Sequence, residues 1–296
     1  MDVTSTLLLL SPELLVLLGA ATVLAMDLAW RDPPKRALSY VTLAVLVAVV
    51  VPVIALWGRQ ESILSGMMAV DPLALYFKLV ACGSGALVVL GSVRYLEDRA
   101  DRRGEFYLLL LLATLAIMLA TSATDLISLY LAFEFLSLTS YVLVSYLRGS
   151  KASIEAGLKY FLYGAMAAAL MLYGMSFLYG AAGTTSLEGI ADSLRVSPTT
   201  LRWLAIPTVV LLLAGFSFKI AIAPFHQWAP DAYQGGPTPA VAFLSVASKM
   251  TGFAVLMRVM VIAMGDFQPT WARILGAFAI VSMVLGNLVA LQQTEI

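Results

Sequence analysis

Long apolar segments separated by short polar connectors make up almost the whole chain. A membrane-spanning helix needs roughly 20 mostly apolar residues. The segments that reach this length are 7–28, 38–57, 72–95, 105–123, 124–147, 154–180, 201–223, 237–263 and 271–292. The connectors hold most of the charged residues, and none is long enough for a soluble domain. This pattern predicts an all-α fold, a polytopic transmembrane bundle of about nine helices.

The seventh segment does not continue as a plain apolar helix. Lys219 lies near its end, and helix-breaking residues follow together with the only histidine of the chain: Pro224, His226, Pro230, Gly235 and Pro237. Within a bilayer, a broken helix is tolerated only where its freed backbone groups face protein or an internal water cavity. We therefore expect a broken seventh helix that forms the centre of a transport site.

Composition agrees with the membrane assignment and excludes several functions. The 296 residues are 61% hydrophobic and 12% charged, with a mean hydropathy of +0.92, which is typical of a protein whose main surroundings are the lipid bilayer. The formal net charge is zero and no basic tail occurs, so nothing predicts a nucleic-acid partner. With one histidine, and with Cys82 as the only cysteine, we expect no metal site.

Glu134 and Lys249 lie well inside predicted spans, and Lys219 lies at the end of the apolar run before the break. A charge at such depth costs about 2.5–3.5 kcal/mol on insertion scales, so it normally faces the bundle interior and finds a partner. Burial disfavours the charged form and an opposite charge favours it, so such groups can change protonation near neutral pH. Histidine titrates most readily in that range, which suits His226 as a link between the lysines. These four residues predict a proton relay.

Other charged residues have simpler interpretations. A fixed ion pair between Glu134 and Lys219 that only sets helix packing is the alternative to the relay. Glu155 and Lys159 are spaced i, i+4 and predict a surface pair, with proton uptake as a further candidate role. Lys78 lies one turn into the third span, from which its side chain is expected to reach the membrane interface. Small residues at Gly164 and Gly174 predict close helix packing.

The distribution of lysine and arginine residues predicts the orientation of the chain. Ten lie on one side: Arg31, Lys35, Arg36, Arg94, Arg99, Arg102, Arg103, Arg148, Lys151 and Lys159. Five lie on the other: Arg59, Arg195, Arg202, Arg258 and Arg273. Because cytoplasmic loops carry the excess of positive charge, we expect the N-terminus outside the cytoplasm.

Several stretches resemble a known family. They are SLTSYVLVSYLRG after Glu134, then IEAGLKYFLYGA, then FKIAIAPFHQWAPDAYQGGPTPAVAFLSVASKMTGFAVLMR, and GNLVALQQTEI at the end. Together they are similar to the antiporter-like membrane subunits of proton-pumping NADH-quinone oxidoreductase (respiratory complex I), and among these to subunit N. The resemblance covers nearly all of residues 105–296, whereas the first three spans match only in pattern.

The resemblance implies roles for the buried residues. Glu134 matches the glutamate of the fifth helix, Lys219 the lysine of the discontinuous seventh helix, and Lys249 the lysine of the eighth. His226 falls in the segment after the break. In the family these residues form a hydrated axis along which protons move when redox events elsewhere shift the charges. The implied localisation is the plasma or inner membrane, and the implied partners are other membrane subunits of the complex.

The resemblance also implies a domain organisation. The family fold has about fourteen helices with two inverted repeats, so residues 1–104 would form helices 1–3. Residues 105–263 would form the first repeat, helices 4–8, and 264–296 the start of the second repeat with helix 9. The rest of the second repeat is expected beyond Ile296. NADH, FMN, iron–sulfur clusters and quinone are expected in partner subunits, with no cofactor in this chain.

One residue departs from the family pattern, and two other functions remain open. Gln234 stands where many relatives carry glutamate, which lowers the local charge without changing the relay groups. A subunit of a multi-component cation/proton antiporter would share the charge pattern. A structural membrane scaffold would use the buried charges only to fix helix packing.

Overall fold

The computed structural model describes residues 3–29, 36–100, 102–196 and 203–293, and within them the predicted all-α membrane fold is confirmed. Eight helical stretches are long and apolar enough to cross a membrane. The ninth expected span corresponds to a shorter apolar helix, α10 (Ala205–Ile220). Of the residues named above, Arg31, Lys35, Arg202 and Ile296 lie outside the described part.

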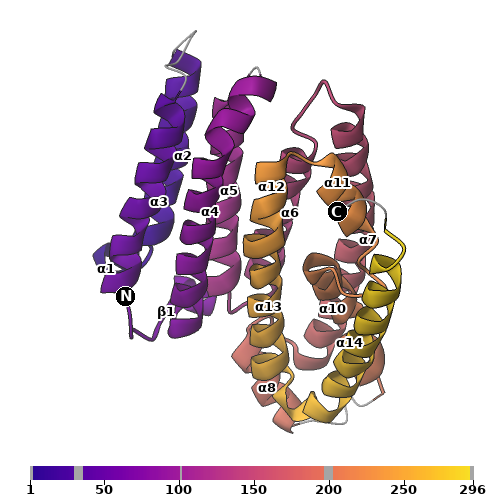
Figure 1. The fold of residues 1–296 in the computed structure, drawn as a ribbon. Helices are drawn as coiled ribbons and strands as arrows, with labels where there is room; N and C mark the ends of the chain where they lie inside the picture. The colour runs from indigo at the N-terminus through magenta and orange to yellow at the C-terminus, as the bar shows by residue number, and fades with distance from the viewer. Residues whose placement is uncertain (1–2, 30–35, 101, 197–202, 294–296) are drawn as a thin grey trace.

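The helices of the first half pack side by side (Figure 1). They are α1 (Val3–Leu9), α2 (Ser11–Ala29), α3 (Ala37–Ala55), α4 (Pro72–Arg99), α5 (Gly104–Ser122) and α6 (Leu126–Val144). A short hairpin of β1 (Glu61–Ile63) and β2 (Met68–Val70), with the turn η1 (Leu64–Gly66), precedes α4. The helix α5 is the most buried span and contacts α2, α4 and α6. It therefore forms the centre of this half.

The second half is arranged around α10 (Figure 1). The long α7 (Lys151–Ala182) packs along it, and α11 (Trp228–Gly235) packs against α7. The other helices of this half include α8 (Leu187–Val196), which comes before α10 in the chain, and α12 (Thr238–Phe243), which comes after α11. The π-helical turn η2 (Leu244–Ser248), α13 (Lys249–Met257) and the π-helical turn η3 (Arg258–Ala263) continue α12 as one span. The turn η4 (Gly265–Phe267) leads into α14 (Gln268–Ala290), whose residues are all at least partly exposed.

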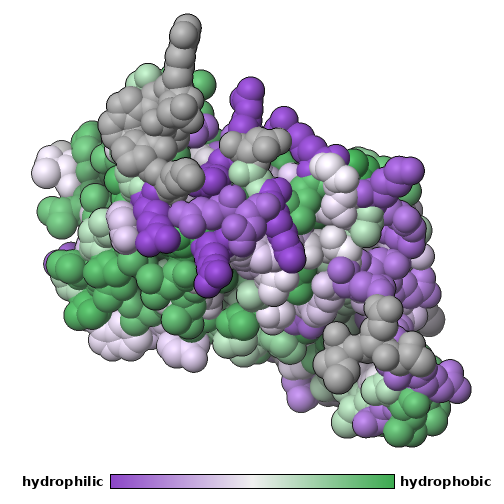
Figure 2. Space-filling view, turned by 45° about the horizontal axis from the view of Figure 1, so that its top comes forward, coloured by the Kyte–Doolittle hydropathy of each residue, from purple (hydrophilic) through white to green (hydrophobic). Residues whose placement is uncertain are grey.

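The bundle has two distinct ends. One end, called here the hairpin end, carries β1, β2 and the start of α4 and lies at the bottom of Figure 1. The other, the arginine-rich end, carries the connectors after α4 and α6. Figure 2 shows hydrophilic side chains gathered over that end and hydrophobic side chains along the flank. This division is what a bilayer requires of a spanning bundle.

Glycine residues allow α7 and α10 to approach closely, as predicted at Gly174. A Cβ atom on Gly174 would lie 2.9 Å from the backbone nitrogen of Leu212 of α10, so a larger residue there would push α7 and α10 apart. Gly164 allows α7 to approach α6, because a Cβ atom there would meet the hydroxyl of Tyr141.

Short elements within the connectors were not predicted. The hairpin lies in the connector 58–71, α8 in 181–200 and α11 in 224–236. Asp125 is buried at the start of α6. Its carboxylate accepts hydrogen bonds from the backbone nitrogens of Ile127, at 2.9 Å, and Ser128, at 3.2 Å, and so caps α6.

Loss of this cap is expected to destabilise the protein measurably. Asp125→Ala leaves helix-end nitrogens without an acceptor, and such changes cost about 0.5–2 kcal/mol. Thermal unfolding in detergent would measure the loss. Asp125→Asn is the matched control because asparagine caps nearly as well. Equal losses in the two variants would contradict the capping role.

Candidate functional site

The seventh span breaks where the sequence predicts. Helix α10 ends at Ile220, and Ala221 takes a left-handed backbone conformation with φ 62°. The chain then turns through Pro224 and His226 before α11 begins at Trp228. Pro230 is accommodated in the first turn of α11, where a missing backbone N–H costs nothing. Gly235 ends α11 and Pro237 precedes α12, so all four predicted breaking residues lie at or between helix ends.

At this break, hydrogen bonds with other protein groups satisfy backbone carbonyl and N–H groups that the helix no longer pairs. The carbonyl of Phe218 accepts hydrogen bonds from the backbone nitrogen of Ala221, at 3.1 Å, and from Trp228 Nε1, at 2.8 Å. The backbone nitrogen of Ala223 donates to Ser282 Oγ of α14 at 2.9 Å. A discontinuous helix within a membrane needs such partners because lipid offers none. Side chains of α11 and α14 therefore hold the break.

Lys219 lies in the last turn of α10 and is completely buried. Its Nζ donates a hydrogen bond to Ser137 Oγ of α6 at 3.1 Å and lies 5.4 Å from the centre of the Phe133 ring. Gly252 of α13 packs against its stem, because a Cβ atom there would lie 3.4 Å from Lys219 Cβ. The ammonium group is thus enclosed by α6, α10 and α13.

Glu134 lies on α6, three residues before Ser137 and on the same face of the helix. It is partly buried. Among the described residues Glu134 and Lys219 form no direct ion pair, and Ser137 holds the lysine instead. The hydroxyl of Ser137, which the sequence did not single out, thus lies between the two helices that carry the predicted pair.

Lys249 and His226 approach the break from α13 and from the turn before α11. Lys249 Nζ lies 5.2 Å from the centre of the Tyr233 ring, over its face. His226 Nδ1 is buried and has no hydrogen-bond partner among the described residues. No hydrogen bond joins two of the four predicted relay residues within the described part of the chain. The structure places Lys219 against α6, the helix that carries Glu134, and places the other two predicted relay residues after the end of α10, in the turn before α11 and on α13.

Glu155 and Lys159 form the predicted i, i+4 ion pair on α7, with 2.8 Å between Lys159 Nζ and Glu155 Oε1. Asp231 of α11 adds a contact at 3.1 Å that the sequence did not predict. All three side chains are well exposed, so the surface interpretation fits this cluster. Its additional effect is to join α7 to the segment after the break.

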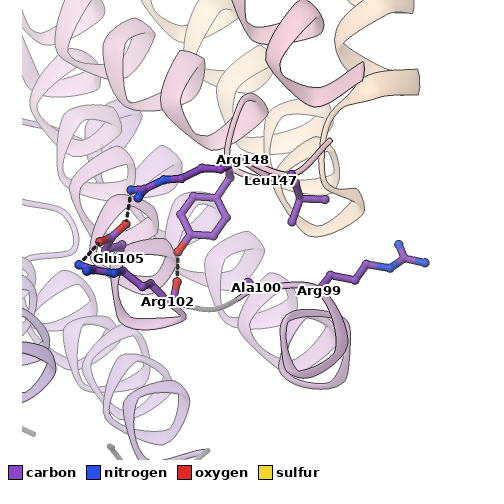
Figure 3. Close-up of a pocket in the computed structure, with 8 residues that line it drawn as sticks. Arg99, Ala100, Arg102, Glu105, Leu147 and Arg148 are labelled. Atoms are coloured by element: carbon purple, nitrogen blue, oxygen red, sulfur yellow. Dashed lines mark hydrogen bonds and ion pairs between the residues drawn. The ribbon is translucent and has the colours of Figure 1, made fainter. Parts of the chain in front are cut away.

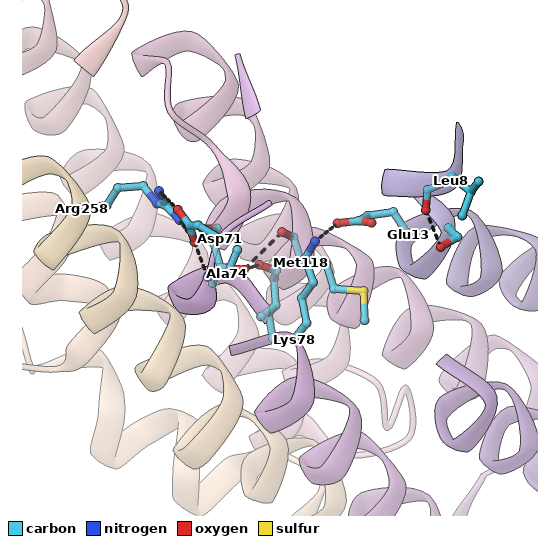
Figure 4. Close-up of polar contacts among 10 residues, drawn as sticks. Leu8, Glu13, Asp71, Ala74, Lys78, Met118 and Arg258 are labelled. Carbon is cyan, nitrogen blue, oxygen red and sulfur yellow. Dashed lines mark hydrogen bonds and ion pairs between the residues drawn. The ribbon is translucent and has the colours of Figure 1, made fainter. Parts of the chain in front are cut away.

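A buried ion pair corrects the prediction for Lys78. Its Nζ lies 2.6 Å from Glu13 Oε1 of α2, and the Lys78 side chain is only 1% exposed (Figure 4). The side chain does not extend to the membrane interface because a carboxylate on the neighbouring helix holds it inside the bundle. The signal that could have found Glu13 is an acidic residue within the first apolar segment, 7–28.

A second ion pair joins Asp71 and Arg258, and its arginine is buried. The sequence places Arg258 only among the cations of the second side and does not predict this partner. Arg258 Nη1 and Nη2 lie 2.8 and 3.0 Å from the two Asp71 carboxylate oxygens (Figure 4). The arginine lies within an apolar segment, 237–263, which was the available signal. Asp71 also caps α4 by accepting from the backbone nitrogen of Ala74 at 2.8 Å.

Two pockets flank the bundle ends. At the arginine-rich end a cavity of about 140 Å³ lies beside Glu105, whose carboxylate pairs with both Arg102 and Arg148 (Figure 3). At the hairpin end a larger pocket of about 540 Å³, called here the hairpin vestibule, is lined by residues 60–62, 66, 69–73, 124, 186 and 188. Neither pocket is lined by a predicted relay residue.

No group of three or more potential metal-ligating side chains occurs in the described ranges. The fold defines a class, a polytopic α-helical membrane protein with one discontinuous span. Discontinuous spans of this kind occur in transporter folds.

Comparison with known proteins gives the family. A family model described as NADH:quinone oxidoreductase/Mrp antiporter, transmembrane, matches residues 123–296. The chain therefore belongs to the NADH:quinone oxidoreductase/Mrp antiporter family of membrane proteins.

Relatives and solved structures agree with this assignment. The chain is 44% identical over 285 residues to NAD(P)H-quinone oxidoreductase subunit 2 of Synechococcus sp. (strain CC9311), covering 96% of this chain and 54% of that protein. It is 39% identical over 293 residues to NADH-quinone oxidoreductase subunit N of Moorella thermoacetica, covering 97% and 60%. A chain of respiratory complex I from Thermus thermophilus superposes with a TM-score of 0.79 at 33% identity, covering 96% and 59%. The chain thus spans a little over half the length of these relatives.

Proposed function

We propose that this chain is a membrane subunit of an NADH-quinone oxidoreductase that translocates protons, coupled to quinone reduction elsewhere in the complex. The observation that carries the proposal is the Lys219 ammonium, which is fully buried beside a broken helix. Burying a charged group in a membrane costs free energy, so a charge at this depth indicates a functional site. The names of the relatives, which are subunits of quinone oxidoreductases, support this reaction over others.

In the proposed mechanism Glu134 and Lys219 form a switchable pair. Ser137 holds the Lys219 ammonium on α6, the helix that also carries Glu134. A change of charge at Glu134 alters how well the buried lysine holds its proton, since opposite charges stabilise each other more strongly in a low dielectric. A proton released from Lys219 would pass to Lys249 through His226, whose buried Nδ1 has no hydrogen-bond partner among the described residues.

The wider setting of the subunit follows from the same proposal. Its partners are the other membrane subunits of the complex, and NADH, FMN, iron–sulfur clusters and quinone are held by partner subunits. The arginine-rich end faces the cytoplasm, as the excess of positive charge there favours, and the N-terminus faces outside. Glu155 and Lys159 lie near that end on α7 and are candidates for proton uptake. The proposed domain organisation is helices 1–3 in residues 1–104, the first repeat in 105–263 and the start of the second repeat in 264–296.

Substitution of the pair tests the mechanism. In membrane vesicles, Glu134→Gln and Lys219→Ala of the full-length protein are each expected to lower NADH-driven proton pumping by on the order of 10²-fold, the lower range for loss of a positioned acid–base group. Quinone reduction should fall with pumping because the two are coupled. Lys151→Gln, at an exposed lysine at the start of α7, is the matched control.

Unchanged pumping and unchanged coupling in both variants would contradict the relay. Loss of assembly, with normal coupling in the enzyme that still assembles, would favour the structural scaffold instead. A multi-component cation/proton antiporter remains the second candidate because the family description includes such antiporters. Copurification with flavin and iron–sulfur subunits would decide for the oxidoreductase.

A further inference from the structure

The guanidinium group of Arg258 is fixed at the hairpin end of the bundle. It makes two parallel hydrogen bonds to Asp71, at 2.8 and 3.0 Å, and Nη2 also donates to the backbone carbonyl of Thr121 at 2.8 Å. The paired geometry is the most specific that arginine forms with a carboxylate. The arginine on η3 is thereby held against the start of α4 and the end of α5.

The two members of this pair face different surroundings. The Asp71 side chain is 24% exposed and lines the hairpin vestibule, whereas the Arg258 side chain is 2% exposed and does not line it. The carboxylate is therefore the member of the pair that lines the vestibule, and the guanidinium lies behind it in the interior of the bundle. Figure 4 shows the two groups paired.

The interior side of this pair leads toward the proposed relay. Lys249 lies on the same span, nine residues before Arg258, or about 13 Å along the axis at 1.5 Å per residue. Buried hydroxyl groups of Ser248 and Thr251 accompany this stretch, and Gly252 touches Lys219. Each of the two π-helical turns adjoins one cation, since η2 ends directly before Lys249 and η3 begins at Arg258. The span therefore runs from Lys249 to Arg258, whose partner Asp71 lines the vestibule.

We propose that Arg258, positioned by Asp71, is a seal that prevents protons from passing between the relay and the hairpin vestibule. This inference rests on the proposed function. Arginine cannot give up its proton in a protein, so it cannot serve as a carrier. Both Asp71 oxygens accept hydrogen bonds from the guanidinium, which fixes the cation in place. A fixed cation on the interior side also repels an excess proton, as cationic side chains do in selective pores.

A purely structural pin is the alternative, because the same contacts tie η3 to α4 and α5. The two roles differ in what they require of residue 258. A seal needs the positive charge, whereas a pin needs only the hydrogen bonds. Arg258→Gln removes the charge and keeps a donor for Asp71 or Thr121. Arg258→Lys keeps the charge.

The test measures passive proton conductance. The complex carrying the full-length subunit is purified, reconstituted into liposomes that contain a pH-sensitive dye, and exposed to a potassium diffusion potential set by valinomycin, without NADH or quinone. Per assembled complex, Arg258→Gln is expected to raise proton conductance about tenfold, equivalent to about 1.4 kcal/mol of lost barrier. Arg258→Lys is expected to stay near the wild type.

The matched control is the double variant Glu13→Gln/Lys78→Met. It removes another buried ion pair from α4, in which neither residue lines the hairpin vestibule, and its conductance should not change. Asp71→Asn retains the cation and should also remain tight. It therefore tests the proposal even when Arg258→Gln fails to assemble.

Wild-type conductance in Arg258→Gln would overturn the seal. An equal rise in the control, or a leak in Asp71→Asn as large as in Arg258→Gln, would show a pin instead. The measurement needs no turnover, so its result is separate from that of the Glu134 and Lys219 variants. Normal pumping in those variants would overturn the proposed function, whatever the conductance of the Arg258 variants.

Discussion

Lys78→Met is expected to lower the free energy of unfolding by about 3–5 kcal/mol, because it leaves the buried Glu13 carboxylate without its partner. The Lys78 and Glu13 side chains are only 1% and 6% exposed, so water cannot take the place of the lysine. Methionine fills much of the same volume, which limits any contribution from a cavity. The unpaired carboxylate charge therefore accounts for most of the expected loss of stability.

The double variant Glu13→Gln/Lys78→Met separates charge from packing. Replacing both members of a buried ion pair is often neutral, so the double variant should recover most of the stability lost in Lys78→Met. Denaturant unfolding in detergent micelles, followed by circular dichroism, would compare the two. A double variant as unstable as the single variant would show that packing around residue 78, and not charge, sets the loss.

Trp228→Ala is expected to cost about 3–5 kcal/mol, the usual range for removing a large aromatic residue from a core. The indole is 1% exposed and is stacked on the Tyr160 ring, with 4.2 Å between ring centres. Its Nε1 also supplies a hydrogen bond to the Phe218 carbonyl at the helix break. The substitution therefore removes both packing and a partner of the broken helix.

Trp228→Phe isolates the second contribution. Phenylalanine retains a stacking ring but leaves the Phe218 carbonyl with one hydrogen bond fewer, a loss expected to cost about 1–3 kcal/mol. The same unfolding measurement applies, and proton pumping by the assembled complex would show whether the break must be held for function. Equal losses in Trp228→Ala and Trp228→Phe would contradict a substantial role for stacking on Tyr160.

The spans and the break were predictable because each depends on local sequence. About twenty apolar residues in a row can adopt few structures other than a spanning helix, and Pro224 to Pro237 interrupt one such run. Glu134 and Lys219 were recognisable as buried charges for the same reason. The hydrogen bond from Lys219 to Ser137 was not predictable, because it spans 82 residues of sequence and serine is common in membrane helices.

The ion-pair partners of the buried charged residues could not be predicted from the sequence. Arg258 and Asp71 are 187 residues apart, and Lys78 and Glu13 are 65 apart (78 − 13). A lysine stem near a span end can reach the interface or turn inward, and only the neighbouring helix decides between them. The short elements β1, β2, α8 and α11 were missed because runs of this length carry little periodic signal.

The helix α4 carries an ion pair on each of two sides, to Glu13 of α2 and to Arg258 of η3. Any dissection of the protein at residue 104 would therefore strand Asp71 on one fragment and Arg258 on the other, each without its counter-ion. The division between the N-terminal helices and the repeat is thus crossed by one ion pair, Asp71–Arg258. Each fragment would need its own unpaired residue neutralised to be stable in the bilayer.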